Sequence, residues 1–129
     1  MPNSKYNTRY SMDLTGGCEW VVEAHGCDAV ALQDLVKLEA LFAGLIRDLA
    51  LHPVADTTWH QFAGAGGITG LSLLAESHIA CHTFPEYRSL CLNLFCCSPR
   101  PDFDFTACLQ REFQASSVRV RRIERPYQI

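Results

Sequence analysis

Short apolar segments alternate with chain breakers between residues 54 and 97, and this pattern limits most strongly the folds open to the chain. Four segments (54–62, 68–75, 79–84 and 90–97) are rich in β-branched, aromatic or leucine side chains, and each is too short for a typical helix. They are separated or ended by a glycine-rich turn at 64–67, by Pro85 and by the Ser-Pro pair at 98–99. Because connections this short favour antiparallel pairing, the region predicts three or four neighbouring strands of one sheet.

Two amphipathic segments flank this region and can cover the sheet. Residues 29–50, which Asp28 can cap, carry an apolar stripe at helical spacing and are expected to form one helix. A second helix is expected from Asp102 or Asp104 to Phe113. The stripe consists of Leu35, Leu38, Phe42, Leu45 and Leu49. Residues 18–25 and 118–123 have strand patterns. The order predicts an α/β (α+β) fold: a two-layer sandwich with a mainly antiparallel sheet, covered by two helices on one face. The other face would stay partly apolar, so a second subunit is expected there.

Composition and charge exclude several classes of protein. The 129 residues carry a formal charge of −3, whereas a nucleic-acid-binding domain usually has a basic surface. No apolar run reaches the roughly 20 residues that span a bilayer. We therefore expect neither nucleic acid nor membrane as a partner. Residues 1–17 are polar and lack the apolar core of a signal peptide, so they are expected to form a poorly ordered extension before a single domain at 18–129.

The chain has seven cysteines and no CxxC pair. An odd number of cysteines without a signal peptide favours reduced thiols and a cytoplasmic location. Five of them have mostly apolar surroundings and are predicted to be small core residues: Cys18, Cys27, Cys81, Cys91 and Cys108.

Three common kinds of site are disfavoured. His78 and His82 would share a strand face but lie ~13 Å apart at ~3.3 Å per residue, too far for one zinc ion, so no metal is expected. The glycine cluster at residues 64–70 precedes an apolar strand and has no lysine, which predicts a tight turn rather than a phosphate loop. The arginines near the C-terminus predict a solvated strand face rather than an anion site: Arg119, Arg121, Arg122 and Arg125.

Titratable residues follow the apolar segment at 68–75. Glu76, Ser77 and His78 come where one strand gives way to the next, and such groups are costly there unless they are paired, so they tend to be functional. The GxSxG elbow is absent, and adjacent strand residues point to opposite faces, so Ser77 and His78 are not expected to form a nucleophile–base pair. The residues alone predict a reactive serine in a strand-end turn, with His82 and a cysteine of the next strand nearby.

Four sequence blocks have a specific composition and spacing. They are G-I-T-G at 67–70, L-A-E-S-H-I at 74–79, H-T-F-P-E at 82–86 and F-C-C-S at 95–98. These blocks resemble the G-V-[ST]-G, L-[AS]-E-S-H-[IL], H-T-W-P-E and F-T-C-G motifs of the small prokaryotic S-adenosylmethionine decarboxylase proenzymes, which are pyruvoyl-dependent. The length and the order of strands and helices agree over most of the remaining chain.

The resemblance implies a proenzyme that cleaves itself. The Ser77 hydroxyl would attack the carbonyl of Glu76 to form an ester, and β-elimination would then yield chains 1–76 and 77–129, the second beginning with a pyruvoyl group made from Ser77. By correspondence, His82 serves in this processing and the hydroxyl of Thr69 assists it. The pyruvoyl group would form a Schiff base with the substrate amine and act as the electron sink for decarboxylation.

The resemblance also implies roles in decarboxylation. Cys97 corresponds to the proton donor, although Cys96 beside it leaves the assignment open, because strand alternation lets only one of them face the site. Glu86 corresponds to a carboxylate that binds the ribose hydroxyls. Phe62 is the candidate for stacking on adenine. The family's dimer, with active sites at its interface, fits the uncovered sheet face expected above.

Several substrate-contacting positions depart from the family pattern. Phe62 lies one residue further from Thr69 than the aromatic residue of most relatives, Phe84 replaces a tryptophan, and Asn93 stands where many relatives have aspartate. The first expectation is decarboxylation of S-adenosylmethionine for spermidine biosynthesis. Two alternatives stay open: decarboxylation of L-ornithine or L-arginine by the same chemistry, and a non-processing regulatory paralogue.

Overall fold

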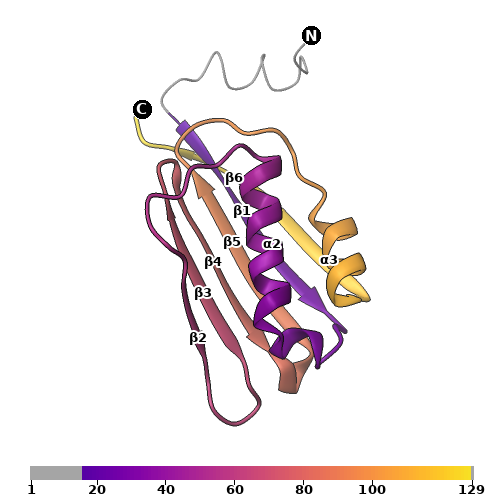
Figure 1. Cartoon of the computed structure of the whole chain (residues 1–129). Helices are drawn as coiled ribbons and strands as arrows, with labels where there is room; N and C mark the ends of the chain where they lie inside the picture. Colours follow the sequence, from indigo (N-terminus) through magenta and orange to yellow (C-terminus); the bar gives the residue numbers. More distant parts are fainter. Residues whose placement is uncertain (1–15, 129) are drawn as a thin grey trace.

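A six-stranded antiparallel sheet forms one layer of the structure, a computed structural model that describes residues 16–128 (Figure 1). Its strands are β1 (Gly16–His25), β2 (Thr58–Gln61), β3 (Ile68–Leu74), β4 (Ser77–Phe84), β5 (Ser89–Cys96) and β6 (Ser117–Pro126). They lie in the order β2-β3-β4-β5-β1-β6, and each neighbouring pair is antiparallel. The expected antiparallel α+β sandwich is confirmed.

Both helices, α2 (Leu35–Asp48) and α3 (Phe105–Phe113), lie over the same face of the sheet (Figure 1). The side chain of Asp104 accepts a hydrogen bond from the N–H of Ala107, so α3 begins at one of the two predicted caps. The prediction of one helix over 29–50 is wrong at its start. The Asp28 side chain accepts a hydrogen bond from the Ala31 N–H at the start of a short turn of 3-10 helix, η1 (Ala31–Gln33), and Asp34 then caps α2 through the N–H of Val36.

The core lies between the helices and the sheet. Alternate residues of the central strands face the helices, and α2 buries most of the predicted stripe against them. The buried residues include Trp20 and Val22 of β1, Leu92 and Leu94 of β5, and Leu38, Phe42, Leu45 and Leu49. At the edge of the sheet, the Trp59 ring lies 4.7 Å from that of Phe42 and crosses over Gly70, where a Cβ atom would come within 2.2 Å of it. Gly70 is therefore required for β2 to be anchored to α2.

The opposite side of the sheet is the open face, on which neither α2 nor α3 packs (Figure 1). The pairing register gives its residues from β3, β4, β5, β1 and β6. They include Thr69, Leu71, Leu73, His78, Ala80, His82, Cys91, Asn93, Phe95, Glu19, Val21, Glu23, Arg121, Ile123 and Arg125. Leu71 and Leu73 are each more than half exposed, so part of this face is apolar as expected. Within residues 16–128, the helices are too short or too polar to cross a membrane.

Two expectations about surface and core residues need correction. Cys18, Cys27, Cys81 and Cys108 are buried, but Cys91 is exposed because it occupies the alternate position between the buried Leu90 and Leu92. Arg121 and Arg125 lie on the open face and pair with Glu23 and Glu19. Arg122 is on the helix-covered side instead, where it pairs with Asp102 and lies over the Trp20 ring.

The first strand begins earlier than expected. Gly16 and Gly17 belong to β1 and pair with Pro126 and Arg125 of β6, so these two residues are not part of a poorly ordered extension. A Cβ atom on Gly17 would lie 2.1 Å from the carbonyl oxygen of Cys96, which explains a glycine at this position. Residues 1–15 of the expected extension lie outside the described residues.

Candidate active site

The turn between β3 and β4 holds Ser77 in an unusual backbone conformation. Its φ angle is 149°, a value that L-residues rarely adopt and that costs on the order of 1–3 kcal/mol. The regular alternation of side chains is therefore broken here, and Ser77 Oγ lies 3.2 Å from His78 Nδ1. The reason for not expecting a nucleophile–base pair, that adjacent strand side chains point to opposite faces, does not hold here because the strand is irregular at Ser77.

The peptide bond before Ser77 is held by the neighbouring strand. The N–H of Cys97 donates a hydrogen bond of 2.8 Å to the carbonyl oxygen of Glu76. Ser77 pairs with Cys96 in the β4–β5 register, which brings Cys97 beside the turn. A hydroxyl group, a polarised carbonyl and a backbone N–H donor thus meet at one peptide bond, an arrangement suited to attack on that carbonyl.

The side chain of Glu76 is fixed as firmly as its backbone. Its carboxylate accepts hydrogen bonds from the His52 N–H at 3.0 Å and is 2.5 Å from His52 Nδ1, and Arg100 Nη2 lies 3.0 Å from it. Burial alone would raise the pKa of this carboxyl, but the hydrogen bonds of His52 and the charge of Arg100 outweigh it, so the pKa lies below its usual value. The carboxylate therefore stays ionised inside the protein.

The two adjacent cysteines differ sharply in environment. Cys96 faces the helices, is fully buried, and burial raises the pKa of its thiol to about 12. Cys97 follows the end of β5 and is exposed. Of the two thiols that the sequence could not distinguish, only Cys97 is accessible to a substrate.

The other predicted residues gather at the opposite end of the sheet. Thr69 Oγ1 and His82 Nδ1 are 2.5 Å apart, and the rings of Phe62 and Phe84 lie 5.6 and 4.4 Å from that of His82. Glu86 is exposed in the short helix η2 (Pro85–Tyr87) that follows β4. We call Thr69, His82, Phe62 and Glu86 the histidine end, and Glu76, Ser77 and Cys97 the cleavage end.

One chain does not bring these two ends together. Ser77 begins β4 and His82 lies five residues further along it, which separates their Cα atoms by about 16 Å at ~3.3 Å per residue. The sequence prediction that His82 lies near Ser77 is wrong within one chain. The histidine that does adjoin Ser77 is His78, which sequence reasoning set aside although it is the next residue.

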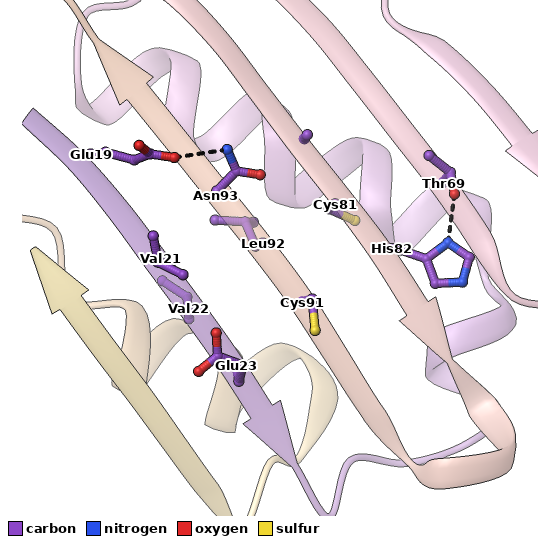
Figure 2. A pocket seen from close by; sticks show the side chains of 11 residues that line it. Glu19, Val21, Val22, Glu23, Thr69, Cys81, His82, Cys91, Leu92 and Asn93 are labelled. Carbon is purple, nitrogen blue, oxygen red and sulfur yellow. Dashed lines mark hydrogen bonds between the residues drawn. The ribbon is translucent and has the colours of Figure 1, made fainter. Parts of the chain in front are cut away.

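A shallow hollow of about 420 Å³ lies on the open face between the two ends (Figure 2). Thr69 and His82 line one side, and Glu19, Glu23 and Asn93 line the other, with Cys91 between them (Figure 2). Asn93 Nδ2 donates to Glu19 Oε2 at 3.2 Å, while Arg125 and Arg121 pair with the two glutamates. The hollow is thus polar at its rims and has its carboxylates already paired.

Comparisons with known proteins agree on one family. Residues 18–126 match the sequence model of the family described as S-adenosylmethionine decarboxylase. An S-adenosylmethionine decarboxylase proenzyme of Picrophilus torridus is 28% identical over 122 residues, which cover 92% of this chain and 90% of that protein. An S-adenosylmethionine decarboxylase proenzyme 2 of Halalkalibacterium halodurans is 34% identical over 91 residues, 68% of each chain.

A solved structure has the same fold. The crystal structure of the adenosylmethionine decarboxylase from Aquifex aeolicus VF5 superposes with a TM-score of 0.74 at 24% sequence identity, covering 89% of this chain and 94% of that one. The arrangement of sheet and helices is therefore one already observed in a crystal.

Proposed function

The chain belongs to the S-adenosylmethionine decarboxylase family, and we propose that it is a self-cleaving, pyruvoyl-dependent carboxy-lyase. Its substrate would be S-adenosylmethionine, and its product the decarboxylated aminopropyl donor for spermidine synthesis. The observation that carries this proposal is the Glu76–Ser77 peptide bond, where a strained serine follows a carbonyl that accepts the N–H of Cys97. Cleavage at this bond would give chains 1–76 and 77–129.

The residues at the cleavage end suit the first step of self-cleavage. As Ser77 Oγ attacks the Glu76 carbonyl carbon, the C–N bond breaks, an ester forms and the hydroxyl proton passes to the released amine. Negative charge develops on the carbonyl oxygen, where the Cys97 N–H already donates. The strained φ of Ser77 favours the reaction as well, because the restraint ends when the peptide bond to the nitrogen of this residue breaks.

A pyruvoyl group made from Ser77 fits its surroundings. Residue 77 is half-buried, and His78 Nδ1 lies within hydrogen-bond distance of its side chain. It pairs with Cys96 of β5, and the exposed Cys97 is the next residue. The group would supply a carbonyl that condenses with an amine and accepts electrons as carbon dioxide leaves. The thiol of Cys97 would then return a proton to the substrate carbon.

The distance between the two ends supports a homodimer with shared sites. In such a dimer, the open faces of two subunits would stack on each other, related by a two-fold axis that lies between the faces and perpendicular to the strands. The strands of one subunit would then run opposite to those of the other, so the cleavage end of one subunit would lie against the histidine end of its partner. The exposed Leu71, Leu73 and Ile123 would be buried in such an interface. His82 and Thr69 would thus assist the cleavage of the partner chain.

The histidine end would also contribute the nucleoside contacts. Phe62 is 47% exposed and Glu86 is exposed, so an aromatic face for adenine and a carboxylate for the ribose hydroxyls are both accessible.

The seven cysteines are all free thiols, as expected of a protein in the reducing cytoplasm. Neither the geometry nor the relatives favour ornithine, arginine or a purely regulatory role.

Release of labelled carbon dioxide tests the proposed reaction. Purified protein is incubated with carboxyl-labelled S-adenosylmethionine, ornithine or arginine in separate reactions, and Ser77→Ala serves as the control. We expect release from S-adenosylmethionine alone, and none from any substrate with the variant. Release from ornithine or arginine, with S-adenosylmethionine inert, would contradict the proposal.

A further inference from the structure

His78 contacts the reacting hydroxyl but has no role in the steps described above. Its Nδ1 atom lies 3.2 Å from Ser77 Oγ, and its Nε2 atom lies 3.4 Å from Asn93 Nδ2. The ring also packs edge-on against Phe95, with centroids 5.9 Å apart. Both ring nitrogens therefore have defined partners, and the ring is fixed in one orientation.

The partners of Asn93 determine which ring nitrogen carries the proton. Asn93 Nδ2 donates to the Glu19 carboxylate, which can only accept, and Arg125 pairs with that carboxylate. Rotating the amide would turn its oxygen toward Glu19, against a negative charge, so the amide nitrogen must stay in place. This same nitrogen faces His78 Nε2, and it can hydrogen-bond there only to a nitrogen that carries no proton. This contact assigns the ring the tautomer with a bare Nε2 and a proton on Nδ1.

A protonated Nδ1 makes His78 a hydrogen-bond donor to Ser77 Oγ. General-base catalysis at this hydroxyl would need the opposite arrangement, a bare Nδ1 that accepts the hydroxyl proton. We propose that His78 acts in self-cleavage by donating a hydrogen bond from Nδ1 to Ser77 Oγ as this oxygen leaves in the elimination step. Asn93 and Glu19 are positioning residues that hold the required tautomer.

The electron balance shows where this donor acts. In the elimination, a base removes the Cα proton of residue 77 and the Cβ–Oγ bond breaks. The electron pair leaves on Oγ, which has become one oxygen of the new Glu76 α-carboxylate, and residue 77 becomes a dehydroalanine. Its enamine tautomerises to an imine, and water converts this to the carbonyl with release of ammonia. The donor at Nδ1 stabilises the negative charge that develops on Oγ.

This inference rests on the proposed function, and its test separates the two. Since the ester and the intact chain have the same mass, hydroxylamine is used to detect the ester, which it cleaves between residues 76 and 77. We expect His78→Leu to form the ester but to eliminate at least tenfold more slowly than the original chain. Hydroxylamine should then release a second fragment that begins with an unmodified Ser77.

Two further variants control this experiment. His78→Asn puts an amide N–H near the former Nδ1 position and should restore much of the elimination rate. His25→Leu changes an exposed histidine that is the last residue of β1, and this variant should cleave like the original chain. Elimination by His78→Leu at the original rate, or a failure of this variant to form the ester, would overturn the donor role. A failure of the unchanged chain to cleave would count against the proposed function itself.

A spectroscopic readout does not depend on cleavage. In the uncut Ser77→Ala protein, ¹⁵N NMR should show the His78 ring protonated at Nδ1 and bare at Nε2, with the signal assigned by its loss in Ser77→Ala/His78→Asn. A proton on Nε2 would overturn the proposal even if His78→Leu failed to fold.

Discussion

The guanidinium of Arg100 and the carboxylate of Glu76 form an ion pair, 3.0 Å between Nη2 and Oε2, that crosses the proposed cleavage site. Glu76 would end the first chain, whereas Arg100 belongs to the second. His52 of the first chain holds the same carboxylate. The residue that supplies the scissile carbonyl is therefore fixed from both sides of the cut, which keeps this carbonyl beside Ser77 before cleavage.

Arg100→Met should destabilise the protein and slow its cleavage. The change leaves a buried carboxylate with His52 as its remaining partner, which we expect to cost about 2–3 kcal/mol. Urea unfolding of Ser77→Ala with and without Arg100→Met measures this cost, because neither protein can cleave. Arg111→Met is the matched control, since Arg111 is exposed and pairs with its neighbour Glu112, and it should leave the free energy of unfolding nearly unchanged. Equal effects of the two changes would contradict the role of Arg100.

The lowered pKa of Glu76 predicts how stability depends on pH. The folded-state pKa lies below the unfolded value of ~4.3, so the Glu76 interactions contribute fully above that pH and are lost as pH falls through the folded-state pKa. The free energy of unfolding of Ser77→Ala should therefore fall in acid more steeply than that of Ser77→Ala/Glu76→Gln. Parallel pH profiles of the two proteins would argue against an ionised, stabilising Glu76.

The strand pattern predicted the fold because burying one face of a sheet requires an apolar residue at every second position of a strand. The apolar positions of β4 and β5 alternate into the core as expected, whereas β3 exposes Leu71 and Leu73 on the open face. The start of α2 was missed because Asp28 and Asp34 are equally good caps, and the preference for Asp34 comes from the 3-10 turn that separates them. Local composition does not distinguish these two possibilities.

The candidate site was less predictable than the fold. The motifs identified Glu76, Ser77 and Cys97, which do lie together, but the contact between Ser77 and His78 depends on one backbone angle that no residue pattern specifies. The distance from Ser77 to His82 follows from strand geometry, yet a motif shared along the sequence suggested proximity. Motifs report which residues serve one site, and not which subunit supplies them.

Mixed dimers should recover cleavage that neither parent shows. His82→Ala retains Ser77, and Ser77→Ala retains His82, so co-expression of the two chains with different affinity tags creates one complete site per heterodimer. We expect cleavage only of the chain that carries His82→Ala. The cleaved share of this chain should not exceed the share of it that is in heterodimers. If this chain stays intact in purified heterodimers, His82 does not act across the interface.

The two adjacent cysteines should separate cleavage from turnover. Cys97→Ala keeps the backbone N–H that donates to Glu76, so the chain should still cleave while decarboxylation falls by at least 100-fold, the lower range for a lost general acid. Cys96→Ala removes a buried thiol and should reduce stability with little effect on turnover of the folded protein. Chain mass and carbon dioxide release measure the two activities, and the reverse pattern would assign the donor to Cys96.

The intact mass of the purified chain tests the central claim most directly. We expect two fragments, 1–76 and 77–129, with the second lighter by one ammonia than a fragment that begins with serine, and Ser77→Ala should remain whole. A single uncut chain under conditions in which the protein is folded and dimeric would contradict self-cleavage at Ser77, and with it the proposed decarboxylase.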